Sequence, residues 1–241
     1  MRGVTAGAVI LGAEAAYAVL RPVPRLAEFD PTGAFGDPGS APLRIAVLGD
    51  SSVTAPGVAG PHEIWVSLVC RRIAESRHVT LHSFAVSGSR AEDLVSGQLE
   101  PALVFDPDLV IVSVGANDVI RGVGLKVFER HLEELVATLD ETGALIVLSG
   151  VGDVGTIPRL KPPLRNMMTR RSARFDRVHH EVAARHGAHV VEHRNDNPAI
   201  WYSDPGLWSP DLFHVSAAGH QRWAAATWRT VEPLIGPHGP F

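Results

Sequence analysis

The sequence predicts an α/β fold in which helices cover both faces of a parallel sheet. Short apolar runs without charges alternate along the chain with longer stretches whose apolar residues recur at helical spacing. Strands that alternate with helices pair in parallel through right-handed crossovers, which gives a three-layer α/β/α sandwich. The 241 residues and this single rhythm favour one main domain, and 45% hydrophobic residues are enough to form its core.

Five apolar runs are expected to be the strands of that sheet, at residues 45–48, 79–86, 109–114, 144–148 and 188–192. The run over 109–114 is the clearest, because it has the apolar character of a strand that is buried on both faces. Five stretches are expected to be helices, at residues 63–77, 90–104, 125–141, 166–186 and 217–234. Gly97 and Pro101 weaken the helix prediction over 90–104, whereas Gly143 is a typical stop after 125–141.

Residues 1–20 form an apolar N-terminal segment, in which only Thr5 and Glu14 interrupt the run from residue 3 to residue 20. Its length approaches the roughly 20 residues that span a bilayer, and residues 16–18 resemble the cleavage site of a secretory signal. Glu14 would be costly in mid-bilayer, so an alanine-rich helix packed on the domain is the alternative. Two locations therefore stay open. The protein is associated with the membrane or cell envelope if residues 3–20 act as an anchor or signal, and it is cytoplasmic otherwise.

Residues 21–42 are rich in proline and glycine and lack periodicity, which is typical of a linker, so the main domain is expected over 43–236. Cys70 is the only cysteine, so no disulfide can form within the chain. The net charge of -4 gives no electrostatic reason to expect nucleic acid as a partner. The sequence does not indicate an oligomeric state.

Three of the expected strands end in turns of polar or glycine residues, namely Gly49-Asp50-Ser51, Ser87-Gly88 and Gly115-Ala116-Asn117-Asp118. The carboxyl ends of parallel strands share one edge of the sheet, where ligands bind in open α/β folds. A fourth polar stretch precedes the last helix and contains Asp211 and His214, close enough for the carboxylate to orient the imidazole. A serine nucleophile with convergent helpers is therefore expected at this edge, with Ser51 as the nucleophile.

The chain resembles the SGNH, or GDSL-type, hydrolases through four motif blocks in the family's order and spacing: Gly49-Asp50-Ser51, Gly88, Gly115-x-Asn117-Asp118 and Asp211-x-x-His214. The resemblance covers residues 43–234, and the stretches 150–158 and 162–165 are similar to the actinobacterial esterase branch. It implies a flavodoxin-like, five-stranded parallel sheet and serine esterase or lipase chemistry without a metal or other cofactor.

The resemblance also implies a role for each matched residue. Ser51 would attack the ester carbonyl, His214 would act as general base and then acid, and Asp211 would fix the histidine tautomer. The backbone N–H groups of Ser51 and Gly88 and the side-chain amide of Asn117 would form the oxyanion hole. The residue types suit these roles, because a glycine N–H approaches an oxyanion closely and an asparagine amide donates without titrating.

Two positions depart from the family pattern. Val215 follows the motif histidine where proline is common, and residues 83–87 lack the asparagine and glycine that often precede the second block's glycine. Neither change removes a catalytic group, so we expect them to alter the cleft floor and the fit of the substrate. Asp50 and Asp118 are expected to hold their turns through side-chain hydrogen bonds, and Ser52 lies one residue late for the nucleophile.

Three further groups have a structural interpretation beside a functional one. No metal site is expected, because metal-ligand spacing is absent from the clustered histidines, which are His179, His180, His186, His189 and His193. A solvated helix face is the ordinary interpretation of the basic residues Arg159, Lys161, Arg165, Arg170, Arg171, Arg174 and Arg177. Contact with an anionic headgroup or a phosphate-bearing substrate is their functional interpretation. Two locations are expected for the aromatic side chains, which either line an acyl pocket or pack in the core: Trp201, Tyr202, Trp208 and Phe213.

The expected function is hydrolysis of small-molecule or lipid esters, with short-chain acyl esters favoured, through a Ser-His-Asp acyl-enzyme mechanism. A carbohydrate O-deacetylase and a lysophospholipase or thioesterase use the same five groups, so they stay as alternatives. An inactive membrane-tethered binding module is the alternative of a different class, because a fold alone does not fix an activity.

Overall fold

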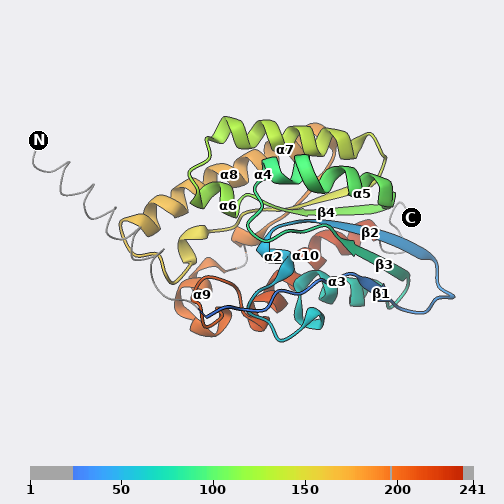
Figure 1. Ribbon diagram of the computed structural model, residues 1–241, viewed down its shortest axis with the longest axis horizontal. Coiled ribbons are helices and arrows are strands. Elements are labelled where there is room, and N and C mark those ends of the chain that lie inside the picture. Colours follow the sequence, from blue (N-terminus) through green and yellow to red (C-terminus); the bar gives the residue numbers. More distant parts are fainter. Residues whose placement is uncertain (1–23, 196, 236–241) are drawn as a thin grey trace, which may run out of the picture.

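A six-stranded sheet forms the centre of the molecule (Figure 1). The computed structural model describes residues 24–195 and 197–235, so the segment 3–20 considered for membrane association lies outside the described residues. The strands are β1 Gly33–Phe35, β2 Pro42–Gly49, β3 His78–Ser83, β4 Leu109–Ser113, β5 Leu145–Ser149 and β6 His189–Val191. Their order in the sheet is β1-β3-β2-β4-β5-β6.

The five strands from β2 to β6 are parallel, and their order β3-β2-β4-β5-β6 is the flavodoxin-like one. The expected α/β/α class and all five expected strands are therefore confirmed. Some bounds differ: the strand expected over 79–86 ends at Ser83, although the N–H groups of Phe84 and Val86 still donate to the Val47 and Gly49 carbonyls of β2.

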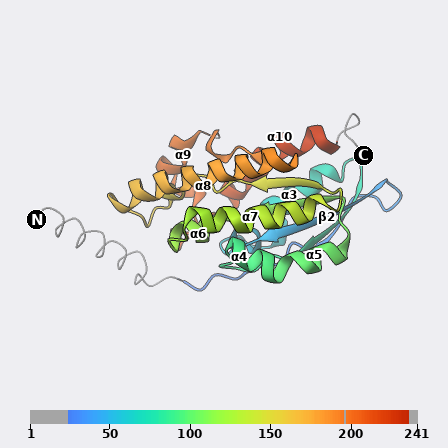
Figure 2. The same ribbon diagram turned by 90° about the horizontal axis from the view of Figure 1, so that it is seen from above.

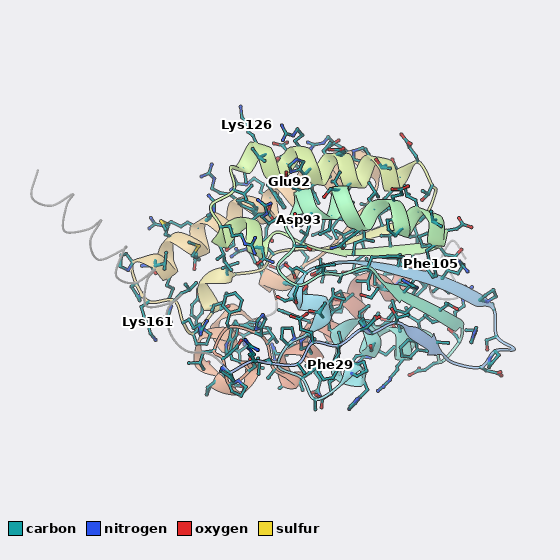
Figure 3. All side chains as sticks on the ribbon, viewed as in Figure 1. Phe29, Glu92, Asp93, Phe105, Lys126 and Lys161 are labelled. Carbon is teal, nitrogen blue, oxygen red and sulfur yellow. The ribbon has the colours of Figure 1, made fainter. Side chains whose placement is uncertain are left out.

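The sixth strand corrects the interpretation of residues 21–42 as a linker. Gly33–Phe35 pairs antiparallel with β3, with Gly33 opposite Leu81, so the sheet is mixed rather than purely parallel. Upstream of β1, the Phe29 N–H donates to the Thr54 carbonyl at 2.8 Å. The Phe29 side chain packs on the face of the sheet that carries α3 and α10 (Figure 3). This part of the segment therefore belongs to the domain.

Two helical layers cover the sheet (Figures 1 and 2). The helices are α2 Ser51–Thr54, α3 Trp65–Ile73, α4 Ala91–Asp93, α5 Leu99–Phe105, α6 Ala116–Ile120, α7 Leu125–Asp140, α8 Leu164–His186, α9 Pro198–Ser203 and α10 Ala217–Ile235. Short 3₁₀ turns lie at Pro61–Glu63, Val154–Thr156, His193–Asn195 and Pro205–Leu207. Every helix of the described part of the chain is too short or too polar to span a bilayer.

Side chains of the central strand alternate between two cores. Ala46 and Leu48 of β2 pack on the face covered by α4, α5, α7 and α8, whereas Ile45 and Val47 pack toward α3 and α10. Successive strand side chains point to opposite faces, so a strand covered on both sides is apolar throughout. The continuous apolar runs in the sequence have this cause.

The helix expected over 90–104 contains one turn of π-helix, Leu94–Gln98, between α4 and α5. A π turn accommodates one residue more than an α turn and shifts the phase of the side chains beyond it. At its end the carboxamide of Gln98 is buried, with 3% of the residue exposed. The irregularity signalled by Gly97 and Pro101 therefore brings a polar side chain into the interior.

Candidate active site

The candidate nucleophile Ser51 lies where β2 ends and α2 begins. Asp50 caps this short helix, and its side chain accepts a hydrogen bond from the Ser52 N–H at 2.9 Å. Such a cap fixes the turn that follows the strand. Ser51 is thereby held at the carboxyl edge of the sheet, partly exposed to solvent.

Asp211 and His214 form a hydrogen-bonded pair, with 2.6 Å between Asp211 Oδ2 and His214 Nδ1. Asp211 Oδ1 accepts from Ser209 Oγ at 2.6 Å and from the N–H groups of Phe213 and His214 at 2.9 Å. Burial acts to raise the pKa of Asp211, but these hydrogen bonds outweigh it and hold the pKa well below its usual range. The ionised carboxylate therefore fixes the imidazole and leaves Nε2 as the nitrogen free for proton transfer.

Asn117 lies in the first turn of α6, directly after β4. Its Nδ2 donates to Asp50 Oδ2 at 2.9 Å and to the Ser89 carbonyl at 3.0 Å, while burial raises the pKa of Asp50. Gly115 before it has a φ of +116°, and a Cβ there would lie 2.7 Å from Val151 Cγ2. Only glycine suits this turn, which delivers the amide to the sheet edge.

Gln98 connects the end of β2 to the turn that contains Gly88. Its Oε1 accepts from the Gly49 N–H at 2.8 Å, and its Nε2 donates to the Gly49 carbonyl at 2.9 Å and to Ser89 Oγ at 3.2 Å. We call these three bonds the Gln98 clamp. Gly88 itself has a φ of +80°, which orients the backbone of that turn.

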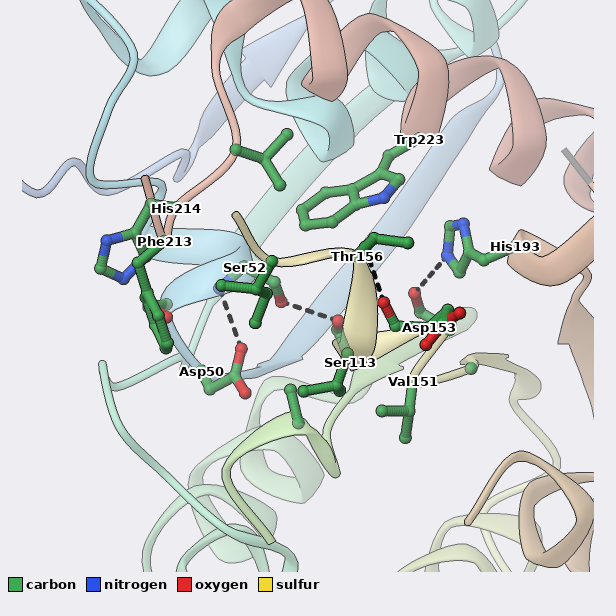
Figure 4. Close-up of a pocket in the computed structure, with 18 of the residues that line it drawn as sticks. Asp50, Ser52, Ser113, Val151, Asp153, Thr156, His193, Phe213, His214 and Trp223 are labelled. Atoms are coloured by element: carbon green, nitrogen blue, oxygen red, sulfur yellow. Dashed lines mark hydrogen bonds between the residues drawn. The ribbon is translucent and has the colours of Figure 1, made fainter. Parts of the chain in front are cut away.

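Ser51, Asn117 and His214 line one pocket of about 150 Å³. Asp211 lies behind His214, and Gly88 is outside the pocket lining. Within the described part of the chain, no direct hydrogen bond joins Ser51 to His214, although both side chains face this pocket. Figure 4 shows His214 at one end of the pocket.

Aromatic side chains form much of the pocket wall, namely Trp65, Trp201, Trp208, Phe213 and Trp223. Trp201, Trp208 and Phe213 were candidates for this wall from sequence, and the structure brings them to it. Tyr202 is not part of the lining: it is 44% exposed, and its hydroxyl donates to Asp153 Oδ2 at 2.6 Å. Trp65 and Trp223 were not expected here, since helical spacing around them indicates only core packing.

Four polar side chains follow four neighbouring strands along the same edge: Ser52 after β2, Ser113 ending β4, Ser149 ending β5 and His193 after β6. Ser52 Oγ lies 2.7 Å from Ser113 Oγ, and Ser149 Oγ lies 2.8 Å from His193 Nε2. All four line the pocket, and we call them the polar row. The signal that sequence reasoning overlooked is a serine at the end of each of two apolar runs.

The clustered histidines separate in the structure. His179 is buried with its ring 5.4 Å from that of Phe128, and burial lowers its pKa. His186 Nε2 lies 2.6 Å from Glu133 Oε1 near the surface. His193 belongs to the polar row, so these side chains do not converge on one point.

The chain matches the model of the GDSL-like Lipase/Acylhydrolase family over residues 47–222. It is 27% identical over 183 residues to the GDSL-like esterase Rv1075c of Mycobacterium tuberculosis, covering 74% of this chain and 58% of that protein's length. It is 26% identical over 200 residues to Esterase TesA of Pseudomonas aeruginosa, covering 81% of this chain and 91% of the relative. The crystal structure of TesA superposes with a TM-score of 0.66 at 25% identity, covering 79% of this chain and 98% of that one.

A solved lipase/acylhydrolase from Enterococcus faecalis has the same fold, with a TM-score of 0.64 at 23% identity over 81% of this chain and 98% of the other. The family model and the esterase relatives indicate a carboxylic ester hydrolase.

Proposed function

Since the chain belongs to the GDSL-like lipase/acylhydrolase family, we propose that it is a serine esterase that hydrolyses short-chain carboxylic esters through Ser51, His214 and Asp211. The observation that carries the proposal is the Asp211–His214 pair beside Ser51 on one pocket. Each group needed for acyl transfer is supplied by the chain itself.

In the first half-reaction, Ser51 Oγ attacks the ester carbonyl while His214 Nε2 takes the hydroxyl proton. Collapse of the tetrahedral intermediate breaks the bond to the alcohol, which leaves with the proton returned by His214. Water, activated by the same imidazole, then hydrolyses the acyl-enzyme and restores Ser51. Asp211 stabilises the transient imidazolium because its carboxylate remains ionised throughout.

The oxyanion of the intermediate would be stabilised by the N–H groups of Ser51 and Gly88 and by the Asn117 amide. Both protons of the Asn117 amide have partners in the resting site, Asp50 and the Ser89 carbonyl. A hydrogen bond to a charged oxygen is roughly twice as strong as one to a neutral carbonyl. We therefore expect the Asn117 amide to give up its hydrogen bond to the Ser89 carbonyl and to donate to the oxyanion instead as charge develops.

The size and lining of the pocket favour short acyl groups. An apolar cavity of about 150 Å³ stays dry and holds a group the size of benzene. The pocket here has a similar volume and walls that include Trp201, Trp208 and Trp223. A space of this size therefore favours a short acyl chain over a long fatty chain.

The proposal is tested by release of p-nitrophenol from p-nitrophenyl butanoate. Ser51→Ala is expected to lower kcat by at least about 10,000-fold, as for other triad nucleophiles. Ser52→Ala, which removes the neighbouring hydroxyl, should lose far less, and exposed Ser96→Ala should match the wild type. A fluorophosphonate should label Ser51, as located by peptide mass spectrometry. Equal rates for wild type and Ser51→Ala, or a label on Ser52, would refute the assignment.

A further inference from the structure

The polar row extends along the pocket away from the chemistry. Its members follow β2, β4, β5 and β6, and the register pairs Ser113 with Ser149. Neighbouring strands lie about 4.8 Å apart, so these four strands cover about 14 Å of sheet edge. Figure 4 shows His214 at one end of the pocket and His193 at the other, with Ser52 and Ser113 between them. The Ser149–His193 pair therefore marks the far end.

This far end is polar within largely apolar surroundings. Ser149 is 5% exposed, the Trp223 ring lies 6.1 Å from that of His193, and Val151 lines the same region. A hydroxyl has one donor and two acceptor sites, and the bond to His193 uses only one of them. Whichever partner donates in that bond, Ser149 Oγ keeps capacity for a second hydrogen bond. A plain alkyl chain would leave this capacity unused, whereas a hydroxyl on the ligand would satisfy it.

The charged groups at this end are already engaged. Arg194 forms an ion pair with Asp176 and donates to the Gly152 carbonyl at 2.6 Å. Asp153 accepts from the Tyr202 hydroxyl at 2.6 Å and would repel a second carboxylate. A neutral polar group on the substrate therefore suits this end better than a carboxylate.

The acyl part of the ester is the part that reaches this end. The alcohol has to leave past His214, whose side chain is 25% exposed, while the acyl group stays bonded to Ser51. On this basis, and resting on the proposed esterase function, we propose that Ser149 and His193 form a subsite for a hydroxyl carried by the acyl chain several carbons from the ester carbonyl. The substrates of this class are esters of hydroxylated short-chain acids.

The test compares kcat/KM for two nearly isosteric esters, p-nitrophenyl ω-hydroxyhexanoate and p-nitrophenyl heptanoate. One net hydrogen bond corresponds to about fivefold in this ratio. Ser149→Ala is therefore expected to lower the preference for the hydroxylated ester about fivefold, and His193→Gln should change it in the same direction. Thr156→Val is the matched control, since it removes a hydroxyl of the same pocket that already donates to the Asp153 carbonyl. It should keep the wild-type ratio.

An unchanged ratio in Ser149→Ala and His193→Gln would overturn the subsite. Hydrolysis of p-nitrophenyl acetate by the wild type and its loss in Ser51→Ala report on the esterase chemistry separately. The subsite also has a readout without turnover: tryptophan fluorescence of Ser51→Ala on titration with ω-hydroxyhexanamide and heptanamide. Tighter binding of the hydroxylated amide that disappears in Ser51→Ala/Ser149→Ala supports the subsite even if no ester is cleaved. Equal binding of the two amides to Ser51→Ala overturns it.

Discussion

Replacing Gln98 by leucine tests whether the Gln98 clamp positions the catalytic turns. Leucine fills a similar volume but makes none of the three bonds, so the Gly49 N–H loses the partner that lies 2.8 Å away. The Gly49 carbonyl keeps its bond from the Val86 N–H at 3.1 Å. One orphaned buried N–H costs about 1–3 kcal/mol and each of the two other lost bonds about 1 kcal/mol, so we expect about 3–5 kcal/mol of destabilisation. For a domain of this size, that lowers Tm by roughly 6–20 °C.

The effect on catalysis follows from what the clamp connects. Gly49 precedes Asp50 and Ser51, and Ser89 follows Gly88 while its carbonyl accepts from Asn117. A misplacement of about 1 Å at a catalytic group costs on the order of 100-fold in rate. Gln98→Leu should therefore lower kcat on p-nitrophenyl butanoate by roughly 10- to 100-fold with a smaller change in KM.

Leu135→Ala separates this effect from a general loss of stability. Leu135 is buried in α7 and does not line the pocket, and its truncation costs about 2–5 kcal/mol. Both variants are assayed at a temperature at which circular dichroism shows them fully folded. If Gln98→Leu then has the kcat of Leu135→Ala and of the wild type, the clamp contributes to stability only and the positioning argument is refuted.

Three other substitutions test the site and its support. Asp211→Asn should lower kcat about 10,000-fold because the imidazole loses its tautomer control, and steady-state activity within tenfold of wild type would contradict this. Gly115→Ala should cost about 1–3 kcal/mol in urea denaturation, since its φ is +116° and its new Cβ would meet Val151. Burial raises the pKa of Asp118 from 3.8 to about 6, so its stabilising contribution is complete below pH 3.8 and is lost as pH rises through about 6. The free energy of unfolding of Asp118→Asn, relative to that of the wild type, should therefore rise by up to about 3 kcal/mol between pH 4 and pH 7. A difference that does not change with pH would contradict the raised pKa of Asp118.

The parallel strands were predictable from sequence because burial on both faces demands apolar residues at every position. β1 was not, because three residues between prolines and glycines carry no periodicity of their own. Gly33–Phe35 becomes a strand only through pairing with β3, a contact that local sequence does not encode. The π turn before Gln98 was equally inaccessible, since Gly97 and Pro101 signal irregularity without indicating which side chain it turns inward.

The candidate catalytic residues were predictable because motif blocks specify them individually, whereas the rest of the pocket depends on sheet order. Ser113 and Ser149 become neighbours only because β4 pairs with β5. Trp201 lines the pocket and Tyr202 does not, and the cause lies in the local helix geometry. Trp201 and Tyr202 are consecutive in α9, and successive helical side chains point about 100° apart, so only one of them faces the pocket.

The Gln98 clamp and the polar row differ in how they are held, and this makes their effects separable. Ser113 and Ser149 end strands, so the hydrogen-bonded sheet fixes their spacing whatever the loops do. The turns that carry Ser51 and Gly88 lie beyond this ladder, and the Gln98 side chain joins one to the other. Loss of the clamp should therefore slow the hydrolysis of every ester by a similar factor, because it displaces protein groups that act on every substrate. Loss of the Ser149 hydroxyl should change only the ratio between hydroxylated and plain acyl chains, because it leaves those groups in position.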